Sequence, residues 1–128
     1  MENPAPAYDD LRTLTEPQRQ QGRSYAGFNP ARHEEIRLFA AVLAGDHIAQ
    51  GFRNHDIRAK LYPKEKNNKK DRQRQRHSAG VGRMLKRLHV RGLVAKVPRS
   101  RRWRITDQGR RILGDALRVY RRYSTQAA

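Results

Sequence analysis

This chain has no cysteine and is poor in acidic and aromatic residues. Its 128 residues include 12 Asp and Glu, and Phe, Trp and Tyr together make up 7%. The absence of cysteine excludes disulfides, thiolate zinc sites and cysteine nucleophiles together.

Long apolar runs are also absent. No segment approaches the roughly 18 apolar residues that a membrane-spanning helix needs. The first ten residues, MENPAPAYDD, lack the basic-then-apolar order of a secretory signal. We therefore expect a cytoplasmic protein that does not span a membrane.

Residues arranged for catalysis or metal binding are scarce too. The five histidines have no ligand spacing beside carboxylates, and the adjacent acids Asp9–Asp10 and Glu34–Glu35 are typical of a polar segment and an early helix turn. No glycine-rich phosphate cradle is present in the sequence. We expect no catalytic activity, no metal and no cofactor.

Positive charge is what the sequence has in excess. It contains 29 Lys and Arg, and its formal net charge is +17. Residues 1–50 carry 5 basic and 7 acidic side chains, whereas residues 51–128 carry 24 and 5. Because so concentrated a charge repels itself in a compact fold, a polyanionic partner is expected. Nucleic acid is the first candidate, and an anionic membrane surface is the second.

The stretch Gln75–Ile105 in the basic half has the clearest pattern. Apolar residues from Val81 to Leu88 recur at the spacing that gives a helix one apolar face, and the basic residues fall off this face. Gly92 follows Arg91, and a basic last turn before a glycine predicts that the helix ends near Arg91.

A two-stranded hairpin is expected after this helix. Pro98–Arg101 has turn chemistry, and Trp103 and Ile105 alternate with arginines, as in a strand with one apolar face. Thr106 is then placed to cap a further helix.

The order of helix, hairpin and helix, with positive charge on the first two, is similar to the second half of a winged helix-turn-helix domain. The segment LKRLHVRGLV (Leu85–Val94) followed by RWRITDQGRRIL (Arg102–Leu113) resembles the recognition helix, the wing and the Thr-x-x-Gly helix start of that family. The resemblance covers roughly Pro30 to Tyr123. It implies a mainly α fold with a small β-hairpin, of the α+β class.

The segment Lys64–His77 departs from the family pattern. A helix-turn-helix usually joins its two helices through about three or four residues, whereas more than a dozen polar residues intervene here. We expect a long basic loop over Lys64–Lys70 and a recognition helix that starts within Asp71–Ser78.

Two shorter helices are expected earlier in the domain. The first begins at Asn29–Pro30 and ends at Gly45, and the second runs from a cap at Asn54 to Leu61. Residues 47–50 between them are expected to pair with the hairpin as a third strand.

The chain is expected to divide into a flexible leader (1–28), a winged helix-turn-helix domain (29–123) and a frayed tail (124–128). The leader is mostly polar and contains three of the six prolines. Two alternatives are open for its scattered apolar residues, such as Tyr8, Leu11 and Leu14. They dock on the domain or on a partner, or they belong to a flexible segment.

The resemblance and the charge together predict which side chains contact nucleic acid. Base contacts are expected at the front of the recognition helix, from Arg76, His77, Ser78 and Arg83. Phosphate contacts are expected from Lys69, Lys70, Arg72, Arg74, Lys86 and Arg87. The hairpin tip is expected to add wing contacts from Arg99, Arg101 and Arg102.

The last helix, Gln108–Tyr123, has a broad apolar face. Either this face packs on the first helix of the domain, or part of it, formed by Leu113, Leu117 and Tyr120, contacts a second copy or a larger protein partner.

Three functions are compatible with the sequence. The preferred one is double-stranded DNA binding by a cytoplasmic, nucleoid-associated protein, as a small bacterial-type regulator of transcription or as the DNA-binding module of a replication or mobile-element protein. The second is an RNA-binding or ribosome-associated winged helix, because basic extensions often become ordered on RNA. The third is a protein-interaction subunit that uses the C-terminal helix or the leader. No membrane partner is expected.

Overall fold

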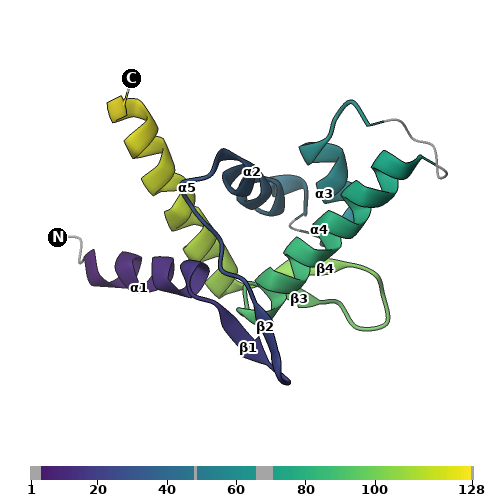
Figure 1. Ribbon diagram of the computed structural model, residues 1–128, viewed down its shortest axis with the longest axis horizontal. Coiled ribbons are helices and arrows are strands. Elements are labelled where there is room, and N and C mark those ends of the chain that lie inside the picture. The colour runs from purple at the N-terminus through teal and green to yellow at the C-terminus, as the bar shows by residue number, and fades with distance from the viewer. Residues whose placement is uncertain (1–3, 48, 66–70, 128) are drawn as a thin grey trace.

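The structure is a computed structural model that describes residues 4–47, 49–65 and 71–127 (Figure 1). It is mainly helical and contains small antiparallel hairpins, which agrees with the expected α+β class. The elements, in chain order, are α1 (Pro4–Thr15), β1 (Gln18–Gln20), β2 (Arg23–Tyr25), α2 (His33–Val42), the 3₁₀ helix η1 (Gly45–His47), α3 (Asn54–Leu61), α4 (Arg72–Val90), β3 (Val94–Lys96), β4 (Trp103–Ile105) and α5 (Asp107–Ala127).

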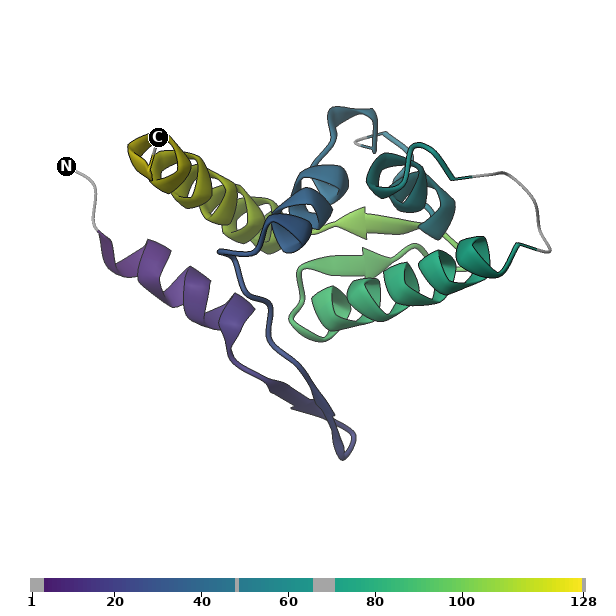
Figure 2. The same ribbon diagram turned by 45° about the horizontal axis from the view of Figure 1, so that its top comes forward.

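The helices enclose one hydrophobic core. α2 packs against α3 and α5, α3 packs against α4, and α1 packs against α5. In Figure 2, α4 lies between the β3–β4 hairpin on one side and the β1–β2 hairpin on the other. The most deeply buried side chains come from nearly the whole length of the chain: Leu14, Leu38, Phe39, Val42, Phe52, Ile57, Val81, Leu85, Leu88, Leu93, Ile112 and Leu113.

The predictions for the central stretch are confirmed. α4 begins at Arg72, where the Asp71 side chain accepts a hydrogen bond of 2.8 Å from the backbone N–H of Gln73. The helix ends at Val90, and Gly92 has a left-handed φ of 75°. Strands β3 and β4 then pair in antiparallel register.

Thr106 caps α5 as expected. Its hydroxyl oxygen accepts a hydrogen bond of 2.9 Å from the backbone N–H of Gly109. The same hydroxyl lies 2.7 Å from the carbonyl oxygen of Gly92, to which it donates. One side chain therefore fixes the start of α5 against the end of α4.

The third strand lies later in the chain than expected. Residues Gly45–His47 form η1, and the pairing with the hairpin is a single bridge between Phe52 and Trp103. Two backbone hydrogen bonds of 2.8 and 2.7 Å make this bridge. Because the Phe52 ring is fully buried, the apolar residue sets the position of the pairing, and the polar residues before it do not. Ile48 lies outside the described residues.

Helices α2 and α3 start close to the expected residues. The Asn29 side chain accepts a hydrogen bond of 3.0 Å from the backbone N–H of Ala31 and forms a turn, so α2 begins only at His33 and ends at Val42. Asn54 is the first residue of α3, and its side chain reaches toward α4 instead of capping its own helix.

The expectation of a flexible leader over residues 1–28 is wrong. α1 and the β1–β2 hairpin occupy most of it, and Leu14 and Phe28 are 0% and 2% exposed in the core. Two of its prolines lie in the first turn of α1, where backbone N–H groups have no helical partner, and Pro17 follows the helix end. The segment is folded although most of its residues are polar, because its apolar side chains Leu14 and Phe28 are buried in the core.

The expectation for the tail needs correction. α5 continues to Ala127, so the tail does not fray from residue 124. Of the two alternatives for the apolar face of α5, packing on the first helix of the domain is confirmed, because α5 packs against α2 and also against α1. Leu113 and Leu117 are 0% and 9% exposed and belong to the interior, and Tyr120 is partly buried at the edge of the core.

Candidate functional site

The exposed face of α4 carries several basic side chains along its length. Val81, Leu85 and Leu88 face the core, and Arg83 lies on the opposite side of the helix. The exposed basic residues on that opposite side are Arg72, Arg76, Arg83 and Lys86, which we call the cationic stripe. Their spacing of four, seven and three residues keeps them on one helix face. Of the contacts expected from the sequence, these four are brought together on one exposed surface.

The tip of the β3–β4 hairpin carries further positive charge. Arg99, which has a positive φ of 59°, and Arg101 are exposed. The turn is held by Ser100, whose hydroxyl donates to the carbonyl oxygen of Val97 at 3.0 Å and accepts from the backbone N–H of Arg102 at 3.0 Å. The arginines at the tip therefore project from a turn with its own hydrogen bonds.

Arg102 differs from its two neighbours at the tip. It is half-buried and lines an open groove of about 530 Å³ together with Asp56 and Lys60 of α3. Because Arg102 is half-buried, it is less accessible to a phosphate than the exposed Arg99 and Arg101 are.

Trp103 is part of the hairpin's support. Its ring meets the His89 ring edge-on at 5.4 Å, and the Lys96 ammonium lies 4.4 Å from its centroid. Because one face is covered by a cation and the edge packs on α4, this ring is not free to stack on a base.

His77 and Ser78 lie on the other side of α4, against α3. The His77 ring stacks on Tyr62, with centroids 3.5 Å apart, and its Nδ1 lies 2.7 Å from a carboxylate oxygen of Glu65. Glu65 also forms an ion pair of 2.8 Å with the buried Arg58. The prediction that His77 contacts bases is therefore not supported by its position.

Ser78 is held by Asn54 in the same interface. The Asn54 amide donates to the carbonyl oxygen of Ser78 at 2.9 Å, and the Ser78 hydroxyl lies 3.4 Å from the Asn54 side-chain oxygen. Ser78 therefore attaches α4 to α3, and the base contact expected from it is corrected accordingly. Arg74 is also only half-exposed, on the same side of the helix. The phosphate contact expected from Arg74 stays a prediction.

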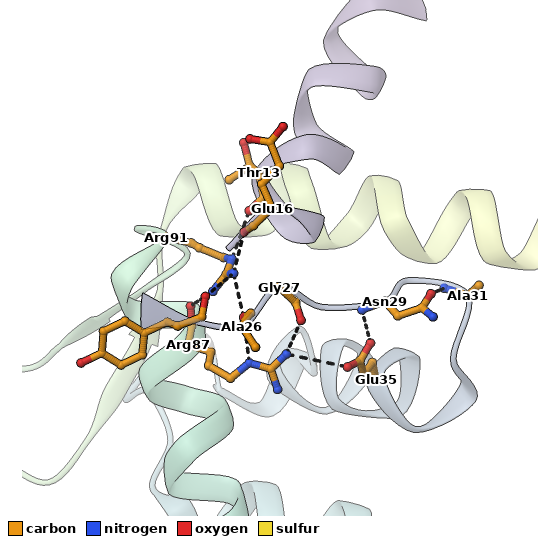
Figure 3. A network of polar contacts seen from close by, with 10 residues as sticks. Thr13, Glu16, Ala26, Gly27, Asn29, Ala31, Glu35, Arg87 and Arg91 are labelled. Carbon is orange, nitrogen blue, oxygen red and sulfur yellow. Dashed lines mark hydrogen bonds and ion pairs between the residues drawn. The ribbon is translucent and has the colours of Figure 1, made fainter. Parts of the chain in front are cut away.

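Arg91 fixes the N-terminal segment to the C-terminal end of α4 (Figure 3). It is 5% exposed, and its guanidinium group donates hydrogen bonds to five backbone carbonyls. These belong to Thr13, Glu16, Tyr25, Ala26 and Arg87, at distances from 2.8 to 3.5 Å. Burial lowers the pKa of Arg91 below its ordinary value, and the nearby charge of Arg87 lowers it further.

Arg87 completes this attachment, and together the two residues form what we call the arginine clamp. Its guanidinium group donates to the carbonyl oxygens of Ala26 and Gly27 at 3.1 and 2.5 Å and lies 4.0 Å above the Phe28 ring. Burial lowers the pKa of Arg87, and the carboxylate of Glu35, 3.9 Å away, opposes that effect. The phosphate contact expected from Arg87 is therefore corrected: its hydrogen bonds are used inside the protein.

The clamp leaves no space for a side chain at Gly27. A Cβ there would collide with the backbone carbonyl of Thr15. The backbone N–H of Phe28 donates to the carbonyl oxygen of Leu14 at 2.7 Å beside this contact. The segment after β2 and the end of α1 thus lie directly against each other.

Some of the expected sites lie outside these groups. Lys69 and Lys70 fall outside the described residues. Within the described part of the chain, no three His, Asp or Glu side chains come together as metal ligands. No helix among residues 4–47, 49–65 and 71–127 is long and apolar enough to cross a membrane.

Comparison of the chain with protein-family models, with curated proteins and with solved structures gave no match.

Proposed function

We propose that this chain binds double-stranded DNA as a winged helix-turn-helix protein, with α4 as the recognition helix and the β3–β4 hairpin as the wing. The order of α3, α4, β3 and β4, with α3 packed on α4, supports this assignment. The bridge from Phe52 to Trp103 corresponds to the third-strand pairing that many winged helices have.

The observation that carries the proposal is the cationic stripe on the exposed face of α4. An α-helix fits the major groove of DNA, where each base pair presents a distinct pattern of donors and acceptors. Arg76 and Arg83 are seven residues apart on this face, about 10 Å along the helix. That separation corresponds to about three base-pair steps. Both arginines are therefore placed to donate paired hydrogen bonds to guanine.

The remaining exposed cations fit phosphate contacts. Arg72 and Lys86 lie at the two ends of the stripe, and Arg99 and Arg101 lie at the hairpin tip. With Arg102 at the edge of its groove, the stripe and the wing together offer seven cations. Five of these remain for phosphate when Arg76 and Arg83 contact bases. At about −0.9 per phosphate contact, binding should fall with salt at a log–log slope of about −4.5.

A duplex partner is favoured over single-stranded RNA by the aromatic side chains. Single-stranded nucleic acid is bound on exposed aromatic rings. Trp103 is covered by Lys96 and His89. Within the described part of the chain, Tyr123, near the end of α5, is the large hydrophobic side chain that is strongly exposed. Among the residues whose exposure is described, no strongly exposed aromatic ring lies beside the stripe.

Binding of a mixed-sequence duplex by fluorescence anisotropy, at about 150 mM salt, tests the proposal. A paired contact to guanine is worth about 1–3 kcal/mol, so Arg76→Gln/Arg83→Gln, which loses two of them, should lose affinity by about 30-fold or more. The matched control is Arg110→Gln/Arg122→Gln, which removes the same charge from exposed positions on α5. Equal losses in both variants, or displacement of the duplex by an equal amount of structured RNA, would overturn the proposal.

A further inference from the structure

The β1–β2 hairpin contributes almost nothing to the core. Of its residues 18–25, only the two at its base, Gln18 and Tyr25, are even half-buried. The β3–β4 hairpin differs, because Val94 is buried and Trp103 packs on the core. Packing therefore does not explain why the chain keeps the first hairpin.

The hairpin is nevertheless held in a fixed direction. Its base is fixed by the arginine clamp, which binds the carbonyls of Glu16, Tyr25, Ala26 and Gly27 on both sides of it. Its strands pair from Gln18↔Tyr25 to Gln20↔Arg23, which leaves a turn of two residues. Gln21 and Gly22 have φ values of 53° and 79°, the left-handed pair that closes a tight hairpin with the natural strand twist.

The position of the hairpin follows from the clamp. Arg87 lies in the last turn of α4 and Arg91 directly follows the helix, and Arg87 is the next residue after Lys86 of the cationic stripe. In both views the hairpin leaves the protein at the C-terminal end of α4 and points away from the other elements (Figures 1 and 2). In Figure 2 it projects on the side of α4 away from the wing.

The chemistry of the hairpin is that of a phosphate-binding element. The sequence contains no acidic residue between Glu16 and Glu34. Arg19 and Arg23 are exposed and form no ion pair within the described part of the chain. Because successive cross-strand pairs alternate between the two faces, the two arginines lie on opposite faces. They therefore flank the uncharged Gln21–Gly22 turn.

We propose that the β1–β2 hairpin is a second phosphate-binding hairpin, whose Arg19 and Arg23 contact the backbone of the duplex that α4 binds. This rests on the proposed function. The duplex then lies against α4, with the wing and the N-terminal hairpin on either side of the helix. Contacts to phosphate carry no sequence information, so the hairpin adds affinity for every duplex alike.

The test is the salt dependence of duplex binding by the full chain and by Arg19→Gln/Arg23→Gln. Loss of two phosphate contacts should make the log–log slope less steep by about 1.8 and lower affinity about 30-fold at about 150 mM salt. The loss should be equal for preferred and random duplexes. Arg110→Gln/Arg122→Gln serves again as the charge-matched control, and urea unfolding of each variant verifies that the exposed substitutions leave the fold intact.

The outcomes separate this proposal from the proposed function. If Arg76→Gln/Arg83→Gln weakens binding while Arg19→Gln/Arg23→Gln matches the control, the hairpin proposal is overturned and the function stands. If the unmodified chain does not bind duplex DNA, or if structured RNA displaces it, both are overturned. A less steep slope with the expected affinity loss in Arg19→Gln/Arg23→Gln, and neither change in the control Arg110→Gln/Arg122→Gln, supports the proposal.

Discussion

Two regions of α4 use arginine for opposite purposes. Arg83, in the middle of the helix, is exposed on the cationic stripe, whereas Arg91, eight residues later, is buried and donates to five backbone carbonyls. A guanidinium group presents a planar fork of donors that suits carbonyl oxygens as well as phosphate oxygens. Net charge alone therefore cannot separate cations that bind a partner from cations that hold the fold together; burial separates them.

The largest expected effect is the loss of the clamp. Arg91→Met should lower the free energy of unfolding by about 3 kcal/mol or more, because buried carbonyls lose their hydrogen-bond partner. Urea unfolding followed by circular dichroism measures this. The matched control, Arg83→Met, should change stability by less than about 0.5 kcal/mol, because its side chain is exposed. Equal unfolding curves for Arg91→Met and Arg83→Met would mean that the buried arginine stabilises the fold no more than the exposed one does.

Arg91→Lys separates charge from geometry in the same region. An ammonium group keeps the positive charge but has no fork with which to bridge carbonyls on both sides. It should therefore lose most of the stability that Arg91→Met loses. Full stability of Arg91→Lys would mean that charge alone holds the segment.

Gly27→Ala tests the same attachment from the other side. The added methyl group collides with the Thr15 carbonyl, and relieving such overpacking costs about 1–3 kcal/mol. Thermal unfolding should show a lowered Tm. Gly45→Ala is the control, since a Cβ there meets nothing within 4 Å. Similar Tm values for both variants would show that α1 and the segment after β2 are not tightly packed.

The stripe and the wing should differ in specificity. Arg83→Ala should lower affinity for a preferred duplex by about tenfold and for a random duplex by less, because a paired contact to guanine is worth about 1–3 kcal/mol. Arg101→Ala should weaken both alike, as a phosphate contact does. Competition titrations with the two duplexes measure this. If Arg83→Ala and Arg101→Ala change the ratio of affinities for the preferred and the random duplex equally, α4 does not read bases.

The smallest expected effect concerns the side of α4 that faces α3. His77→Gln should lower the free energy of unfolding by about 1 kcal/mol, because it loses the stacking on Tyr62 and the contact with Glu65. Its preference among duplex sequences should be unchanged. A changed preference, measured by selection from a random pool, would return His77 to the base-reading surface.

Local patterns explain how much of the fold could be predicted. The apolar residues from Val81 to Leu88, the glycine at 92 and the threonine at 106 act through neighbours a few residues away. α4, the β3–β4 hairpin and the start of α5 were therefore predicted correctly. The N-terminal segment was not, because its structure depends on Arg87 and Arg91, some sixty to eighty residues away. Backbone carbonyls, which those arginines bind, leave no pattern in a sequence.

The sequence did contain a pattern that separates the candidate contacts facing α3 from those on the exposed face of α4. Extending the apolar face of α4 backward by four residues from Val81 reaches His77, and by seven from Leu85 reaches Ser78. The same helical period places Arg76 and Arg83 off this apolar face. The helix period thus separates neighbouring residues that charge and proximity had grouped together. Arg87 has no such signal, because only the docked N-terminal segment removes it from the surface.

Cleavage of DNA from a chelated iron tethered to the stripe tests the central claim most directly. The chain has no cysteine, so Ala79→Cys, at an exposed position between Arg76 and Arg83, gives one attachment point. Tyr123→Cys, near the end of α5, is the control. We expect a narrow window of cleavage on both strands from position 79 and none from position 123. Cleavage from position 123 alone, or equally from both, would contradict the placement of α4 in the groove.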